Sequence, residues 1–281
     1  MTYSIENGRF RVSARTMGAE LCAFTDLADG HEYLWAGDPA IWSGQSPLLF
    51  PIVGRLRDDI YCLRGKEYTM KKHGFAKKSE FALESISDTE MVFVLRDSEE
   101  TRAGFPFAFA LRVRYAFVDG GFVMEHRVTN PNAETMYFSL GAHPAFAIDL
   151  YDRVVLDAPE TLDAWQLDEN ALRAERQLPV FDNSRELVIT PEIFENDALI
   201  FDGLKSRGAS VIRKNGRNVH VAFDAPCLGI WAKPAAPYVC IEPWHGIDDR
   251  FDAGHDFTRK ERIVALPAGE EWVFPVEITA I

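Results

Sequence analysis

The sequence predicts an all-β protein, in which many short strands form a sandwich or a barrel. Three observations support this prediction. Apolar and polar residues alternate at period two along several segments, short strand-like runs are separated by turn residues, and helical patterns are few. Repeated short strands with turn signals between them are typical of sandwiches and barrels. Apolar residues make up 47% of the 281 positions, so the chain can bury a sizeable core.

The expected strands follow one another along the chain. Residues 9–15 and 109–117 alternate cleanly, and residues 122–128 alternate less cleanly. Residues 90–96 are instead a continuous apolar run between charged residues, which is typical of a strand buried on both faces. The glycines of Asp119-Gly120-Gly121 favour the positive φ angles of a tight turn, so the flanking strands are expected to form a hairpin. Further strands are expected at residues 219–223, 228–231 and 272–278.

Helices and loops complete the expected organisation. Short helices are expected near residues 39–42 and 191–194, and the more polar stretch 158–185 is expected to be rich in loops. The charged residues 97–100 are expected to be solvated surface. No Ser/Gly/Pro-rich linker and no repeat of fixed period interrupts the sequence. We therefore expect residues 1–281 to form a single domain.

Charge, cysteine content and the lack of long apolar stretches indicate the kind of partner and the cellular location to expect. The formal net charge of −13 and the pI near 5.0 argue against nucleic acid or an anionic membrane as the main partner. The four cysteines are scattered among apolar neighbours, so reduced thiols are expected in preference to two disulfides. The N-terminus shows no secretory signal, and no stretch approaches the roughly 20 apolar residues of a membrane span. We therefore expect a cytoplasmic protein.

Two short apolar segments each contain one ionisable residue. His143 lies within Leu140-Gly-Ala-His-Pro-Ala-Phe146, and Glu242 lies within Cys240-Ile-Glu-Pro-Trp244. A charge buried without a partner is costly, so such residues need a structural or functional reason. Each one alone has a structural alternative, a satisfied core histidine or a carboxylate that caps a turn. Together, one imidazole and one carboxylate can serve as general acid and base.

Two further polar residues lie in similar settings. Arg55 follows a strongly apolar run and a glycine, and it either directs its donors at substrate oxygens or pairs with Asp58 or Asp59. His73 precedes Gly74, where a turn of the backbone would expose the imidazole. The remaining histidines show no metal-binding spacing, and no nucleotide-binding glycine motif is present. We therefore expect neither a metal site nor a nucleotide cofactor.

With these residues gathered, the sequence resembles the aldose 1-epimerase (galactose mutarotase) superfamily, and most closely its LacX-like branch. The matching blocks recur in the same order across nearly the whole chain, which makes their combination specific. They are Gly18–Leu21, His31–Pro39, Phe50–Leu56, His73–Ala76, Leu140–Phe146, Asn196–Phe201, Ile241–Trp244 and Leu266–Glu270.

The resemblance implies a large antiparallel β-sandwich, the galactose mutarotase-like supersandwich, with a sugar-binding cleft across one sheet. It implies that Glu242 is the general base and His143 the general acid. It also implies that Arg55 and His73 bind substrate and that Asp197 binds a sugar hydroxyl. The implied reaction interconverts the α and β anomers of a free hexose. One base and one acid suffice for this small-molecule substrate, without a metal or redox cofactor.

Three alternatives remain open at this stage. A carbohydrate-binding or regulatory protein would keep the cleft without turnover. A glycoside hydrolase would use two carboxylates, for which Glu242 and Asp197 are candidates. A sugar-phosphate mutarotase would need a basic subsite, and the candidates for it are Arg55, Arg57, Lys71 and Lys72.

Overall fold

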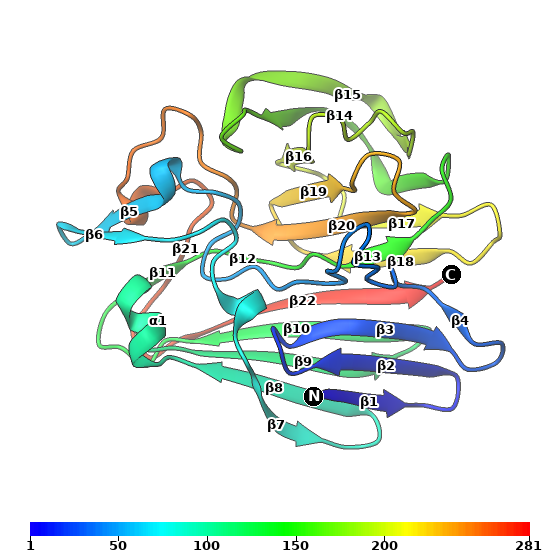
Figure 1. Ribbon diagram of the computed structural model, residues 1–281, viewed down its shortest axis with the longest axis horizontal. Helices are drawn as coiled ribbons and strands as arrows, with labels where there is room; N and C mark the ends of the chain where they lie inside the picture. Colours follow the sequence, from blue (N-terminus) through cyan, green and yellow to red (C-terminus); the bar gives the residue numbers. More distant parts are fainter.

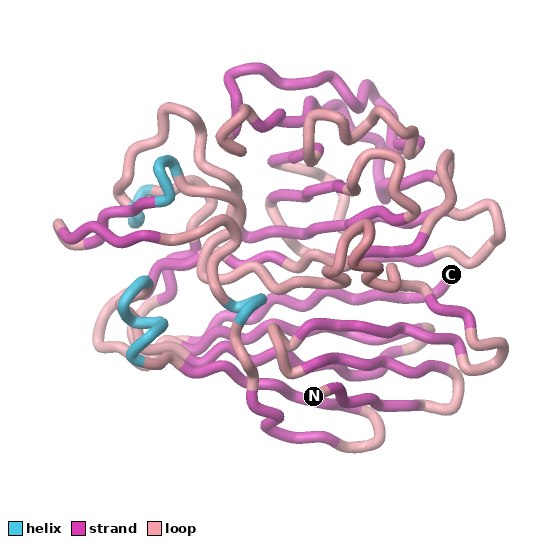
Figure 2. The backbone as a smooth tube through the Cα atoms, viewed as in Figure 1, coloured by secondary structure: helices cyan, strands magenta, loops and turns pink.

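The computed structural model describes residues 1–281 and consists almost entirely of antiparallel strands. A four-stranded sheet packs against part of a 14-stranded sheet, and Figure 1 shows β1 to β3 lying over β8 to β10. The rings of Phe24 and Phe122 meet between the two sheets with 5.0 Å between their centroids. The predicted β-sandwich is confirmed. Figure 2 shows how little of the backbone is helical.

The bounds of the strands follow the sheets. The four-stranded sheet contains β1 (Thr2–Glu6), β2 (Phe10–Arg15), β3 (Glu20–Asp26) and β4 (His31–Glu32). The large sheet has the order β12-β20-β19-β16-β14-β17-β18-β22-β10-β9-β8-β7, with β13 on β20 and β15 on β14. Its strands are β7 (Ala82–Ile86), β8 (Glu90–Arg96), β9 (Ala110–Val118), β10 (Gly121–Thr129), β12 (Leu140–Gly141), β13 (Ala145–Ala147), β14 (Arg153–Leu167), β15 (Arg173–Val188), β16 (Leu199–Asp202), β17 (Gly208–Ile212), β18 (Val219–Phe223), β19 (Cys227–Trp231), β20 (Tyr238–His245) and β22 (Glu271–Ala280).

The remaining elements are small. Two separate strand pairs join β5 (Ile60–Leu63) with β6 (Lys66–Thr69) and β11 (Met136–Phe138) with β21 (Val264–Leu266). One short α-helix, α1 (Glu99–Gly104), and three 3₁₀ turns, η1 (Arg57–Asp59), η2 (Ala76–Lys78) and η3 (Phe257–Arg259), complete the structure.

All of the expected strands are present. They correspond to β2, β8, β9, β10, β18, β19 and β22. The predicted turn at Asp119-Gly120 joins β9 to β10, where Val118 lies opposite Gly121. Residues 39–42 and 191–194 are turns or extended chain rather than the predicted helices. Each segment begins at a proline, Pro39 or Pro191, and is too short for a helix to propagate beyond one turn.

Two polar segments adopt regular structure that was not predicted. Helix α1 includes part of the charged run 97–100, and a reciprocal capping box between Ser98 and Thr101 holds its first turn. Residues 158–185, predicted to be loop-rich, belong to the long ribbon of β14 and β15 (Figure 1). This ribbon projects from the large sheet and keeps many side chains in solvent, so its strands carry little apolar alternation.

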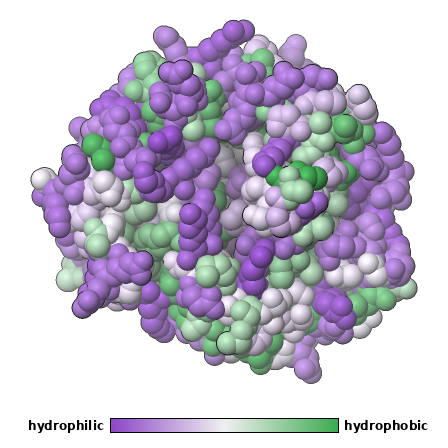
Figure 3. Space-filling model, in the orientation of Figure 1, coloured by the Kyte–Doolittle hydropathy of each residue, from purple (hydrophilic) through white to green (hydrophobic).

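The core lies between the two sheets and extends along the large one. One cluster of 67 buried residues contains members from β1 through to β22. A smaller cluster surrounds Trp244, with Leu49, Val53, Ile200, Cys227 and Ile247. Hydrophilic side chains dominate the face drawn in Figure 3, with apolar ones in small groups. All four cysteines are free thiols. None of the helices has the length and apolar character that crossing a bilayer requires.

Candidate active site

Glu242 lies in the middle of β20, a strand whose residues are nearly all buried. The neighbouring strand β19 places Gly229 directly opposite this residue. A Cβ atom on Gly229 would come within 2.6 Å of the Trp244 ring and 3.3 Å of the Glu242 side chain. The absence of a side chain at Gly229 therefore leaves the room that Glu242 and Trp244 occupy. Glu242 itself is only 1% exposed.

His143 lies in a short interruption between two strands that both pair with β20. Gly141 of β12 lies opposite Trp244, and Ala145 of β13 lies opposite Cys240. Pro144 follows the histidine and offers no N–H for a ladder hydrogen bond, so the pairing breaks there. The paired ends fix the position of the loop, and His143 faces the centre of β20.

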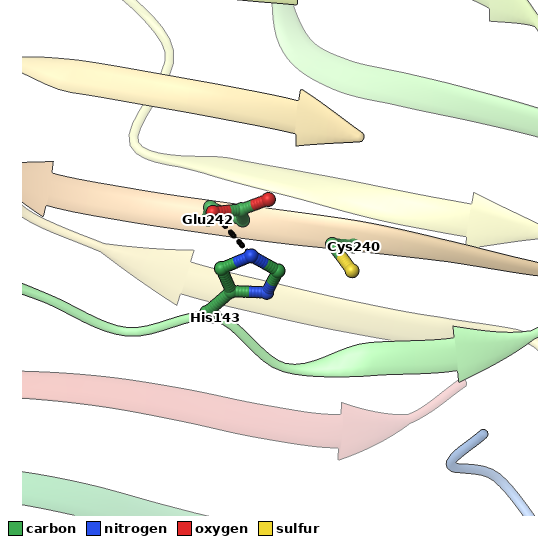
Figure 4. A group of neighbouring side chains, drawn as sticks. All are labelled: His143, Cys240 and Glu242. Carbon is green, nitrogen blue, oxygen red and sulfur yellow. Dashed lines mark ion pairs between the residues drawn. The ribbon is translucent and has the colours of Figure 1, made fainter. Parts of the chain in front are cut away.

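The imidazole and the carboxylate meet at this point. His143 Nε2 lies 3.1 Å from Glu242 Oε2, as Figure 4 shows. Both residues are buried, and both border a cavity of about 620 Å³. The residues bordering the cavity include Trp42, Leu49, Lys72, His73, Lys77, Lys78, His143, Asp197, Trp231, Glu242, Trp244 and Asp248. Their convergence makes this cavity the candidate active site.

Aromatic rings surround the imidazole. The ring centroids of Trp42 and Trp231 lie 5.4 Å and 5.8 Å from that of His143. Trp42 also stacks on Tyr238 at 5.2 Å, which fixes the orientation of the indole. Flat apolar rings beside polar groups suit the mixed surface of a sugar, whose C–H faces stack while its hydroxyls form hydrogen bonds.

His73 borders the same cavity in a constrained turn. Its backbone has a φ of 66°, and its N–H donates to the Gly54 carbonyl at 2.8 Å. In return the Gly54 N–H donates to His73 Nδ1 at 3.1 Å. Nδ1 is therefore the acceptor and Nε2 carries the ring proton. Burial lowers the pKa of His73 well below its usual value, so this residue is a neutral donor.

Asp197 and Lys72 form a second polar group on the cavity wall. Lys72 Nζ lies 3.8 Å from Asp197 Oδ2, a loose ion pair between two half-exposed side chains. Asp197 has a φ of 69°, and its Oδ1 accepts the N–H of Ala198 at 2.8 Å. This bond fixes one carboxylate oxygen and leaves the other available to a ligand.

Arg55, whose side chain is expected to bind substrate, does not border the cavity in this structure. Its Nε donates to Asp59 Oδ1 at 2.8 Å, and its Nη1 donates to the Asn170 carbonyl at 3.0 Å. Only its backbone faces the site, where the Arg55 N–H donates to Asp248 Oδ1 at 2.8 Å. The Arg55 guanidinium therefore pairs with Asp59, which is the structural alternative that the sequence left open for this residue.

Several residues of the site carried no signal that singled them out. Asp248 is buried at the cavity, but in the sequence it stands beside Asp249 and Arg250, as an ordinary surface carboxylate would. Lys77 and Trp42 also border the cavity, but they resemble ordinary surface and packing residues in the sequence. Their contribution depends on which loops the fold brings together.

Burial opposes the charged form of both members of the central pair. It raises the pKa of Glu242 well above its usual value and lowers the pKa of His143 to about 3. The Lys72 ammonium partly opposes the first shift, because a cation favours the carboxylate. Between these two pKa values the pair holds one proton, and burial favours a carboxylic acid beside a neutral imidazole. Their contact is a short path for that proton.

Cys240 lies beside the pair, and the donor atoms of His143, Cys240 and Glu242 all lie within 4.8 Å of one another (Figure 4). These residue types can bind a metal ion once the thiol is ionised and the imidazole nitrogen is free. Burial holds the pKa of the Cys240 thiol well above its usual value, which disfavours the thiolate that a metal ion needs, and the contact with Glu242 occupies His143 Nε2 but not Nδ1. The arrangement therefore suits proton transfer better than metal binding.

Comparison with known proteins assigns the family. The chain belongs to the aldose 1-epimerase family, whose model matches residues 1–279. It is 32% identical to the plasmid and chromosomal forms of protein LacX from Lactococcus lactis subsp. lactis, over 95% of each chain.

Solved structures agree with this assignment. A galactose mutarotase related enzyme from Lactobacillus acidophilus superimposes with a TM-score of 0.93 at 32% identity, over 100% of this chain and 97% of the other. A galactose mutarotase-like protein from Lactobacillus casei superimposes with a TM-score of 0.94 at 27% identity, over the whole of both chains.

Proposed function

We propose that the protein is a mutarotase, which interconverts the α and β anomers of a pyranose by general acid–base catalysis. The observation that carries this proposal is the contact of 3.1 Å between His143 Nε2 and Glu242 Oε2 at a cavity lined with indole rings. Membership of the aldose 1-epimerase family supports an isomerase. The roles assigned below to individual residues are part of the proposal.

The reaction needs two proton transfers in each direction. Glu242 removes the proton from the anomeric hydroxyl, and His143 gives a proton to the ring oxygen. The C1–O5 bond then breaks, and a carbonyl forms at C1. Rotation about the C1–C2 bond presents the other face of the aldehyde, and the reversed transfers close the ring. Each residue ends in its starting protonation state, so the cycle balances.

Proton transfer between the two residues prepares the reactive form. Between the lowered pKa of His143 and the raised pKa of Glu242 the pair carries one proton, and passage of this proton from Glu242 to His143 yields a carboxylate base beside an imidazolium acid. Lys72 favours this ionised form at Glu242, because its ammonium stabilises the carboxylate. His73 supplies a neutral N–H donor to the sugar, and Asp197 accepts a sugar hydroxyl.

The test is to replace each member of the pair and follow optical rotation of freshly dissolved α-glucose and α-galactose. Glu242→Gln keeps the shape of the side chain but removes the base, and His143→Asn replaces the ring with a smaller amide and removes the acid. Positioned proton transfer contributes about 10²–10⁴-fold, and a loss of that size is expected for each variant. Glu169→Gln and His220→Asn, which lie outside the cavity, serve as matched controls and should retain the wild-type rate.

Three results would contradict this proposal. Rates close to wild type in Glu242→Gln or His143→Asn, with an intact fold by circular dichroism, would remove that residue from the mechanism. Sugar binding by the wild-type protein without faster equilibration would instead identify a carbohydrate-binding protein. Release of reducing sugar from an aryl glycoside would identify a hydrolase, for which Glu242 and Asp197 are the candidate carboxylates.

A further inference from the structure

The cavity gathers cations although the chain as a whole is strongly acidic. Three lysines border it, Lys72, Lys77 and Lys78, and we call them the lysine wall. The last two belong to the 3₁₀ turn η2, which follows directly after the turn that holds His73. The protein has a formal net charge of −13, so its composition alone would not lead us to expect three lysines side by side.

The lysine wall lacks the counter-charges that other cations of the chain have. Lys77 is half-buried and Lys78 is exposed, and neither forms an ion pair or a side-chain hydrogen bond. Lys72 has only the loose contact of 3.8 Å with Asp197. In contrast, the buried Lys260 pairs with Asp249 at 2.6 Å, outside the cavity.

The remaining cation at the cavity is already neutralised. Arg15 Nε lies 3.2 Å from Glu20 Oε2, and Arg15 Nη2 donates to Gln45 Oε1 at 3.0 Å. Three other carboxyls border the cavity: Asp197 pairs loosely with Lys72, and burial raises the pKa values of Glu242 and Asp248, which disfavours their charged forms. The positive charges without a counter-charge are therefore those of the lysine wall. Mutual repulsion within this wall adds to burial in lowering the pKa of Lys77, and Lys78 and Lys72 are the repelling groups. An anion in the cavity would relieve this repulsion.

The lysine wall lies close to the catalytic pair. The fields of Lys77 and Lys72 both act on the His143 imidazole, and the field of Lys72 also acts on Glu242. Because the three lysines, His143 and Glu242 all border one cavity, a sugar bound at the pair can place a charged substituent beside the lysines. The anomeric oxygen has to be free, because it loses its proton and becomes the carbonyl oxygen. The charge has to lie on a carbon other than C1.

We propose, on the basis of the mutarotase function above, that the preferred substrate is an anionic pyranose carrying a phosphate or a carboxylate on a non-anomeric carbon, which the lysine wall binds. Lysine ammonium groups form short, charge-assisted hydrogen bonds with the oxygens of either group. This proposal changes the expected substrate from a free hexose to a charged one.

The experiment measures anomer exchange by proton NMR for glucose 6-phosphate, glucuronate and glucose at low ionic strength. We expect kcat/KM for the better anionic sugar to exceed that for glucose by about tenfold or more, with the difference shrinking as salt screens the lysines. Whichever of glucose 6-phosphate and glucuronate has the higher kcat/KM shows whether the preferred anion is a phosphate or a carboxylate. Equal kcat/KM for all three sugars would overturn the proposal.

Variants test whether the lysine wall causes the preference. In the double variant Lys77→Gln, Lys78→Gln, the ratio of kcat/KM between the better anionic sugar and glucose should fall toward one. The matched control is Lys71→Gln, because Lys71 pairs with Asp59 outside the cavity, and it should keep the wild-type ratio. An equal loss for charged and neutral sugars in the double variant would assign these lysines a general electrostatic role and overturn the proposal.

A binding measurement separates this inference from the mutarotase function. Titration calorimetry with glucose 1-phosphate and glucose 6-phosphate reports binding whether or not turnover occurs. Binding of glucose 6-phosphate that weakens in the double variant, without exchange of any sugar, would support the anionic subsite and refute the mutarotase. Exchange of glucose without preferential binding of glucose 6-phosphate or glucuronate would support the mutarotase and refute the anionic subsite.

Discussion

The proton shared by His143 and Glu242 is subject to opposing influences from neighbouring residues. Burial pushes both groups toward their neutral forms, while the Lys72 ammonium favours the carboxylate. Burying ionisable groups in this way lowers the stability of the fold, and such burial is found where shifted pKa values serve proton transfer. Between their two shifted pKa values the pair therefore holds one shared proton, which the proposed acid–base mechanism uses.

This arrangement predicts the pH dependence of exchange. The first proton leaves the doubly protonated pair near the lowered pKa of His143, about 3, and the last proton leaves at the raised pKa of Glu242. The active state holds one proton, so kcat/KM for glucose should be level between these limits and fall beyond them. In Lys72→Met the pKa of Glu242 should rise further, because a stabilising cation is lost.

The measurement is a pH–rate profile of anomer exchange for the wild type and Lys72→Met. The basic limb, where the last proton is lost, should move to higher pH in the variant. Lys71→Met, at an exposed neighbour that pairs with Asp59, is the control and should leave that limb in place. A basic limb that stays in place or moves to lower pH in Lys72→Met would contradict the assigned electrostatics.

At the scale of elements, β20 and two backbone turns hold the site. Central strand β20 carries Glu242, the interrupted edge between β12 and β13 carries His143, and the turn at His73-Gly74 carries the neutral donor. The turn packs closely against another segment. A Cβ atom on Gly74 would lie 2.2 Å from the Phe50 carbonyl oxygen, and Gly74 has a φ of 66°. Its conformation therefore couples the His73 turn to the core.

Gly74→Ala tests this coupling. A side chain at positive φ costs about 1 kcal/mol, and overlap with the Phe50 backbone adds about 1–3 kcal/mol or more. We expect a free energy of unfolding lower by about 2–4 kcal/mol together with a fall in kcat/KM. Gly65→Ala is the control, because Gly65 has a φ of 75° with open space around it and should lose only the backbone cost. Equal losses in the two variants, measured by urea unfolding, would show that the close approach is unimportant.

At the scale of the whole molecule, a buried histidine far from the cavity links stability to pH. His126 of β10 lies opposite Phe274 of β22, is 1% exposed, and its Nδ1 lies 3.1 Å from the Phe274 carbonyl oxygen. Burial lowers its pKa to about 4, from 6.5 for the exposed group. The folded state therefore prefers the neutral ring.

The lowered pKa gives a stability effect of known sign. Between pH 6.5 and 4 the unfolded chain binds a proton at His126 that the folded chain does not, so stability falls as the pH falls through this window. From pH 7 to pH 5 the loss due to His126 is about 2 kcal/mol. In His126→Gln this part of the pH dependence should disappear, as measured by urea unfolding at both pH values. The prediction is wrong if the stability of His126→Gln changes with pH as much as that of the wild type and of the control His220→Asn.

Local patterns in the sequence predict the fold class and the principal strands. Alternation at period two reports that one side of a segment is buried, and this local property predicted β2, β9 and β18. It also indicated His143 and Glu242, because an ionisable residue in an apolar stretch is conspicuous without any knowledge of its partner. The ribbon of β14 and β15 was missed because strands that project into solvent carry no such signal.

Only the tertiary structure decided which residues meet. Strand order in the large sheet places β12 and β13 on β20, so His143 contacts Glu242 although the two are distant along the chain. Contacts between distant segments also bring Lys77 to the cavity, whereas the Arg55 side chain turns to Asp59, only four residues further along the chain. Periodicity along a chain reports burial, whereas contact between side chains depends on pairings between distant segments. The content of the site is therefore a property of the folded molecule.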